Sequence, residues 1–138
     1  MLPTLRDLLE LPELTAGQPQ VVSGSAGLDA PVRWLHIADA PNPAASLRGG
    51  EVLLTTGREF GTRPASIERY LDALIAVGAV GLLIRTADGA LPPHLVDYAQ
   101  TREFPVIHLR QRIAFVGVTE IVHRRILASL AGRIERAR

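Results

Sequence analysis

The sequence predicts an α/β fold: a mainly parallel β-sheet with helices packed on it, followed by a long amphipathic helix at the C-terminal end. Two observations predict it. Between residues 51 and 109, short apolar runs alternate with segments whose apolar residues recur every three or four positions. Strand, helix, strand, helix, strand with short connections is typical of consecutive right-handed crossover units. From about residue 114, an apolar stripe with helical spacing continues almost to the last residue.

A short capped helix is predicted at the start of the chain. Leu5, Leu8 and Leu9 share one helical face. Thr4 precedes them as a suitable N-cap, and Asp7 stands where its carboxylate can reach back to the cap.

Two short strands are predicted next, at residues 21–22 and 32–37. They are joined by a loop that contains the glycines of segment 24–27. The Pro-Asn-Pro sequence at 41–43 must interrupt any regular element, and one helical turn is expected between it and the glycine pair at 49–50.

The central segment is predicted to alternate three strands with two helices. The strands are expected at residues 51–56, 80–84 and 105–109, where the sequence is nearly continuous in apolar residues, as in strands buried on both faces. The first helix has proline in its first turn and a closing glycine, Pro64–Gly78. The second opens at the proline pair 92–93.

The C-terminal segment is predicted to be one helix with an apolar stripe. The stripe comprises Phe115, Val118, Val122, Ile126, Leu130 and Ile134. A helix of about 24 residues spans roughly 36 Å, which is longer than one small sheet layer can cover. Part of the stripe is therefore expected to contact another chain or domain. We accordingly expect an α/β domain at residues 1–113 and a connector or dimerisation helix, supporting a homodimer, at 114–138.

Composition excludes several classes of protein. The chain of 138 residues is 47% hydrophobic with a mean hydropathy of +0.18, enough to bury a core. The longest apolar run, residues 73–84, is too short to span a membrane, and no secretory signal is visible, so a cytoplasmic location without membrane contact is expected. The absence of cysteine excludes disulfides, thiolate metal sites and a cysteine nucleophile.

Charge is distributed unevenly along the chain. Residues 1–101 hold 7 arginines against 11 acidic residues, whereas residues 102–138 hold 8 arginines against 3 glutamates. The basic end nevertheless has no second helix at a short turn, so a helix-turn-helix cannot be assembled. Specific DNA binding by this chain alone is therefore not expected.

The sequence contains no motif that predicts catalysis, a metal or a cofactor. Gly24 and Gly27 do not match a phosphate-binding loop. Glu120 and His123 have the i, i+3 spacing of di-iron bundles, but a solvated helical ion pair explains them better. No serine has glycine two residues before and after it, as a hydrolase nucleophile elbow would. The chain is therefore predicted to be neither an enzyme nor a cofactor protein.

Polar residues follow the predicted parallel strands where each strand ends. They are Thr55, Thr56, Gly57, Arg58, Arg85, His108 and Arg110. Ligands of parallel α/β sheets settle at this edge, and two guanidinium groups there could grip one anion. The alternative is a solvated network in which the arginines pair with Asp39, Glu59 and Asp88. We predict these seven residues as a ligand-binding rim, with His108 as a group that could sense protonation.

A family resemblance covers most of the chain. It rests on the helix at residues 4–9, on Val-Arg-Trp-Leu-His-Ile at 32–37, and above all on Gly-Gly-Glu-Val-Leu-Leu-Thr-Thr-Gly at 49–57. The segments 78–84 and 104–109 continue it. These segments resemble the N-terminal domain of PucR-type, purine catabolism regulator-like transcription factors.

The resemblance implies a bacterial regulator in which this domain senses a metabolite, such as a purine breakdown product or an amino acid. A separate C-terminal helix-turn-helix, absent from this chain, would bind DNA. The resemblance supplies no catalytic residue and leaves the ligand open. Two functions remain: a sensory module with a polar-rimmed pocket, or a dimerisation and interaction module without its own ligand.

Overall fold

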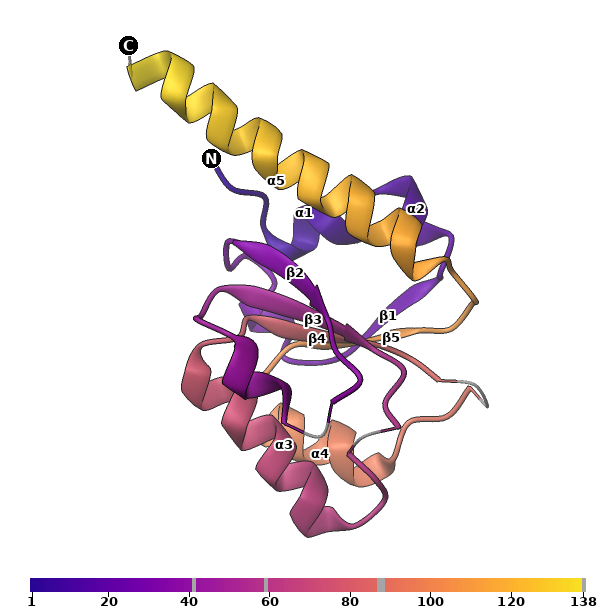
Figure 1. The fold of residues 1–138 in the computed structure, drawn as a ribbon. Coiled ribbons are helices and arrows are strands. Elements are labelled where there is room, and N and C mark those ends of the chain that lie inside the picture. Colours follow the sequence, from indigo (N-terminus) through magenta and orange to yellow (C-terminus); the bar gives the residue numbers. More distant parts are fainter. Residues whose placement is uncertain (41, 59, 87–88, 138) are drawn as a thin grey trace.

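Five strands form one sheet in the order β1-β5-β4-β3-β2 (Figure 1). The computed structural model describes residues 1–40, 42–58, 60–86 and 89–137, with side chains up to residue 131. The strands are β1 (Pro19–Ser23), β2 (Trp34–Ile37), β3 (Glu51–Thr55), β4 (Gly81–Arg85) and β5 (Val106–Leu109). The helices are α1 (Leu5–Leu9), α2 (Pro12–Thr15), α3 (Pro64–Val77), α4 (Pro93–Thr101) and α5 (Phe115–Ala137), with short 3₁₀ turns η1 (Ser25–Gly27) and η2 (Pro43–Ser46).

The predicted mainly parallel sheet is confirmed. β2, β3, β4 and β5 are parallel to one another, whereas β1 pairs antiparallel with the other side of β5. The two predicted N-terminal strands therefore lie at opposite edges of the sheet. Because four strands run in the same direction, the carboxyl ends of β3, β4 and β5 meet at one edge.

Helices cover both faces of the sheet and divide the core in two (Figure 1). One cluster joins side chains from α1, α2 and α5 to one face, including Leu5, Leu54 and Val122. The other joins α3 and α4 to the opposite face, including Leu71 and Leu82. The strands β3 and β4 contribute to both clusters, which explains their nearly unbroken apolar sequence.

The N-terminal segment has the predicted helix cap, but it differs from the prediction after the first helix. The Thr4 hydroxyl accepts from the Asp7 N–H, and the Asp7 carboxylate accepts from the Thr4 N–H, which completes a capping box. The short helix α2, which begins at Pro12, was not predicted. β1 is also longer than the predicted strand, because pairing with β5 supplies hydrogen bonds that local propensity does not show.

α5 packs its first half on the sheet. Val118, Val122 and Ile126 are buried in the core beside β-strand residues, whereas Leu127 and Leu130 are 55% and 38% exposed. The C-terminal part of the helix extends beyond the sheet in Figure 1. Ile134, the last residue of the predicted stripe, has a side chain outside the described part. None of the described helices is long and apolar enough to cross a membrane.

Candidate functional site

The parallel register brings the ends of three strands into line. Thr55 of β3 lies opposite Ile84 of β4, and Ile84 lies opposite His108 of β5. Arg85 likewise lies opposite Leu109. Neighbouring strands are about 4.8 Å apart, so side chains that follow these positions share one edge. The sequence-predicted rim residues are thus neighbours in space as well as at strand ends.

One cavity at this edge collects four arginines. Arg58, Arg85, Arg110 and Arg112 line a space of about 410 Å³, together with Thr86 and neighbouring loop residues. Three of the four were predicted as ligand-binding residues. We call this space the arginine compartment. Four arginines around one cavity supply hydrogen-bond donors that suit a negatively charged occupant.

A second cavity adjoins the first. It has a volume of about 380 Å³ and shares Arg58, Arg85 and Thr86 with the arginine compartment. Its remaining wall includes the predicted residues Thr56 and Gly57, and adds Phe60, Gly61, Thr62, Ala90 and Pro92. We call it the Phe60 compartment. Two spaces of different character therefore meet at the same two arginines.

Two of the arginines are held by contacts that do not neutralise them. The guanidinium carbon of Arg85 lies 4.9 Å from the centre of the Phe115 ring. The Nε atom of Arg110 donates to the backbone carbonyl of Gln18 at 2.9 Å. A cation over a ring and a donor to a carbonyl both keep the full positive charge while restricting the side chain. Because the two side chains are already restricted, binding an anion would cost less side-chain conformational entropy.

The described residues do not bear out the alternative ion-pair network at Asp39. Its carboxylate accepts from the Thr56 hydroxyl at 3.2 Å instead. Among described residues, the ion pairs of the chain join other arginines and a histidine to carboxylates, and none involves the four arginines of the cavity. Glu59 and Asp88, the other two expected partners, lie outside the described residues.

The turn after β3 depends on Thr55 and Gly57. The Thr55 hydroxyl accepts from the Gly57 N–H at 3.1 Å, and Thr55 is fully buried. Gly57 has a φ of 82°, a conformation that favours glycine. Thr55 therefore shapes the turn and does not line either compartment, whereas Thr56 reaches the cavity wall.

His108 lies beneath the rim and not on its surface. The residue is 6% exposed, and its Nε2 atom is 3.2 Å from the hydroxyl of Thr86, which lines both compartments. Burial lowers the pKa of His108, and the positive charge of Arg110 lowers it further. A neutral imidazole near pH 7 is consistent with a position among arginines.

The seven predicted site residues did not include Arg112, Phe60 or Thr86, the last of which directly follows Arg85 at the same strand end. Arg112 follows β5 by three residues and repeats the arginine at 110, so the alternation Arg-Gln-Arg was a usable signal. Phe60 carried no such signal. It is buried against Gly57 and meets Tyr70 of α3 edge-on, with 4.9 Å between ring centres. Only the folded loop brings it beside the strand ends.

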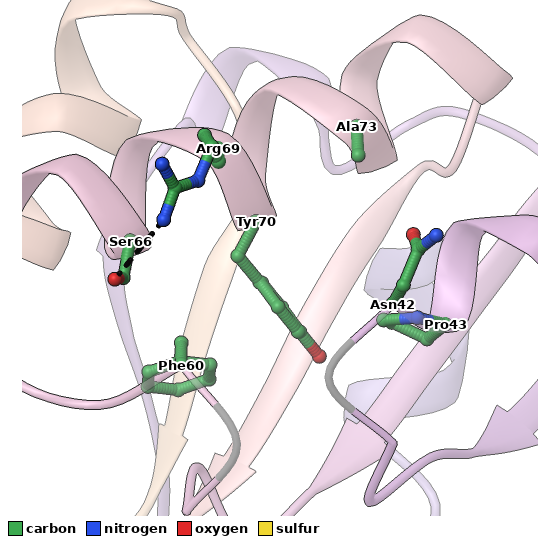
Figure 2. A pocket seen from close by; sticks show the side chains of 7 residues that line it. All are labelled: Asn42, Pro43, Phe60, Ser66, Arg69, Tyr70 and Ala73. Atoms are coloured by element: carbon green, nitrogen blue, oxygen red, sulfur yellow. Dashed lines mark hydrogen bonds between the residues drawn. The ribbon is translucent and has the colours of Figure 1, made fainter.

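Another cavity lies between α3 and the loop before η2 (Figure 2). It measures about 390 Å³ and shares Phe60 with the Phe60 compartment. Its charged lining residue is Arg69, whose guanidinium is hydrogen-bonded to Ser66 on the same helix, as Figure 2 shows. With one exposed arginine, this cavity offers a charged ligand fewer hydrogen-bond donors than the strand-end rim does.

Two of the histidines, His94 and His123, contact other protein groups. The Nε2 atom of His123 lies 2.7 Å from the Leu35 carbonyl, and its ring stacks on Trp34 with centres 3.6 Å apart. The expected Glu120–His123 ion pair is replaced by this contact with β2, because α5 packs on that strand. His94 is paired with Glu68 of α3 at 2.8 Å. Within the described residues, no three potential metal ligands gather.

Comparison with known proteins places these features in context. The model of the purine catabolism regulatory protein-like family matches residues 7–126. The chain is 23% identical over 133 residues to the purine catabolism regulatory protein of Bacillus subtilis (strain 168) and 29% identical over 122 residues to the transcriptional activator PmfR of Paenarthrobacter nicotinovorans. These matches cover 95% and 86% of the chain, but it spans only 25% of the length of each relative.

One solved structure shares the fold. It is the crystal structure of the CBS and DRTGG domains of the regulatory region of Clostridium perfringens pyrophosphatase, complexed with its activator diadenosine tetraphosphate. The match has a TM-score of 0.53 and 14% sequence identity, and it covers 83% of this chain and 45% of the other. At this identity the likeness concerns the fold alone.

Proposed function

Because this chain belongs to the purine catabolism regulatory protein-like family, we propose that it is the sensory domain of a bacterial transcriptional regulator and binds a small anionic metabolite at the strand-end rim. The observation that carries the proposal is the arginine compartment, where four guanidinium groups line one cavity. No described carboxylate forms an ion pair with any of them. Such a cavity is suited to an anion.

The comparisons support the regulatory part of the proposal. Both relatives are named as regulators of transcription and not as enzymes. The solved neighbour belongs to a regulatory region that was crystallised with its activator, a polyanionic nucleotide. By analogy, binding of a small anion here would control gene expression through a DNA-binding region outside this chain. A cytoplasmic location follows from that role and is part of the proposal.

A thermal-shift screen of the 138-residue chain tests the proposal. Purine catabolites, amino acids and dicarboxylates are the compounds to screen, since a ligand that binds only the folded state raises the melting temperature. The affinity of any hit is then measured by calorimetry in Arg85→Ala and Thr56→Val. Arg124→Ala on the exposed side of α5 is the matched control. Unchanged affinity in both folded rim variants would place the site elsewhere.

Self-association is a second candidate function, favoured by the surface around α5. Leu127, Leu130, Trp34 and Ile37 are exposed on α5 and on the neighbouring edge strand β2. Trp34 and Leu130 line the same shallow cavity. Exposed apolar side chains on an edge strand and on the helix beside it are typical of an interface. We propose a homodimer through this surface, with residues 114–138 as its connector helix; a domain that dimerises without binding any ligand would be an interaction module.

A further inference from the structure

The two rim compartments differ in chemistry although they share a wall. Arg58, Arg85 and Thr86 line both. Beyond that wall, the arginine compartment adds Arg110 and Arg112 and is dominated by charge. A single ligand that occupies both compartments would contact arginines at one end and mainly apolar residues at the other.

The arginine compartment fits a compact dianion better than a single carboxylate. Four like charges in one cavity repel one another, and one negative charge offsets only part of that repulsion. Arg110 reaches the cavity from β5 and Arg58 from β3, on opposite sides of Arg85. A phosphate group presents three acceptor oxygens from one centre and can accept hydrogen bonds from several directions. A dicarboxylate would separate its two charges.

The Phe60 compartment fits a flat uncharged group. Ala90 and Pro92 supply accessible apolar surface, the buried Phe60 ring forms the wall behind it, and Gly57 contributes no side chain. The Phe60 ring is fixed edge-on against Tyr70, so its orientation does not depend on a ligand. Apart from the shared wall, its polar side chains are those of Thr56 and Thr62. Flat rings bury large apolar area and pack well beside an aromatic side chain.

We propose that the rim recognises a phosphate ester of a flat, uncharged ring, with the phosphate in the arginine compartment and the ring in the Phe60 compartment. Arg58, Arg85 and Thr86 then lie at the ester linkage. The inference rests on the proposed function and narrows the class of its ligand. It assigns phosphate binding to one compartment and ring binding to the other, so a substitution in one compartment should leave binding in the other intact.

Three probes separate the tasks: phenyl phosphate, inorganic phosphate and benzyl alcohol, measured by calorimetry with the full chain at constant ionic strength. Phenyl phosphate should bind about tenfold more tightly than inorganic phosphate, because only it fills both compartments. Benzyl alcohol should bind more weakly than either. Equal affinities for phenyl phosphate and inorganic phosphate would overturn the inference.

Two exposed residues provide the matched variants. Ala90→Gln fills part of the Phe60 compartment without changing charge, so it should remove the advantage of phenyl phosphate and leave the affinity for inorganic phosphate unchanged. Arg112→Ala should weaken both anions by about fivefold. Arg124→Ala should weaken neither. An advantage of phenyl phosphate that survives Ala90→Gln contradicts the assigned ring site.

The outcomes also distinguish this inference from the proposed function. If inorganic phosphate and phenyl phosphate bind equally and Arg112→Ala weakens both, the anion site stands and the two-compartment ligand is wrong. If neither anion binds and no metabolite shifts the melting temperature, the proposed function fails as well. Thermal unfolding of each variant, followed by circular dichroism, verifies that lost affinity is not lost folding.

Discussion

The Nε2 atom of His108 lies 3.2 Å from the hydroxyl of Thr86, which joins a buried side chain of β5 to the segment that follows β4. This hydrogen bond supports the shared wall of the two compartments from below. We expect protonation of the imidazole to weaken this support, since a second proton would add positive charge beside Arg110.

The stability of the fold should decrease as the pH falls below about 6.5. Burial lowers the pKa of His108 in the folded chain, so the unfolded chain binds a proton at a higher pH than the folded chain does. Between the unfolded pKa and the lower folded pKa, protonation therefore favours unfolding. Urea unfolding of the wild type and of His108→Gln at pH 7.5 and 5.5 measures the effect.

The wild type should lose more free energy of unfolding over this interval than His108→Gln does. Gln20→Ala, an exposed change on β1 that removes no titratable group, is the control and should lose as much free energy of unfolding as the wild type. An equal pH dependence in His108→Gln and the wild type would show that His108 is not the responsible group.

Gly57→Ala should destabilise the fold more than Gly61→Ala. Both glycines have positive φ, 82° and 63°, so both substitutions cost about 1 kcal/mol of backbone strain. A Cβ atom at Gly57 would also stand 3.0 Å from the Phe60 ring and 3.3 Å from Ile84, whereas nothing lies within 4 Å at Gly61. The excess cost is expected to be about 1–2 kcal/mol.

Chemical denaturation of the two glycine variants provides the measurement. The comparison isolates the packing of Phe60 beneath the turn, because the strain is common to both. If the two variants are equally stable, Phe60 does not press on Gly57 and the wall of its compartment is looser than the structure indicates.

Leu127→Glu with Leu130→Glu should produce monomers. Both side chains are exposed on α5, and two carboxylates would disrupt an apolar interface without entering the core. Sedimentation velocity should show a dimer for the wild type and a monomer for the double variant. Val116→Glu, at an exposed position in the first turn of the helix, is the control. A wild type that is already monomeric at high concentration would refute the dimer.

Ile126→Glu, in contrast, cannot serve as an interface test. The sequence placed Ile126 in the stripe offered to a partner, but this side chain is fully buried against the sheet. A buried unpaired carboxylate would unfold the domain, at a cost of several kcal/mol. The loss of dimers would then report unfolding.

The chain by itself should show no sequence-specific affinity for DNA. Its basic residues near the C-terminal end lie on one helix, α5, and none of the other described helices is joined to it by the short turn of a helix-turn-helix. Gel-shift assays at about 150 mM salt should show only weak binding that declines with added salt, as nonspecific phosphate contacts do. Nanomolar, sequence-dependent binding would contradict this prediction.

The central fold could be predicted because its signals are local. Each of β3, β4 and β5 is apolar on both faces, and Pro64 and Gly78 mark the limits of α3, so sequence alone gave these elements to within one or two residues. β1 could not be predicted in full, because its pairing partner is β5, which is distant in the sequence. Edge strands depend on such partners more than on propensity.

The rim could be predicted only in outline. Strand ends in a parallel sheet meet at one edge, which was enough to group Arg58, Arg85 and Arg110. The burial of each side chain could not be predicted from the sequence. Thr55 and His108 are buried, whereas Thr56 lines a cavity. That distinction depends on how the following loops fold back, and loop paths are set by tertiary contacts.

Arg85 takes part in two features of the structure at once. Its guanidinium lies over the ring of Phe115, the first residue of α5, and the same residue lines both compartments. If an anion bound at the rim moved Arg85 away from Phe115, it would also alter the packing of the helix start. By reciprocity, a change at the helix start that moved Arg85 would alter the anion affinity by the same factor. One side chain therefore connects the strand ends to the helix that leaves the sheet.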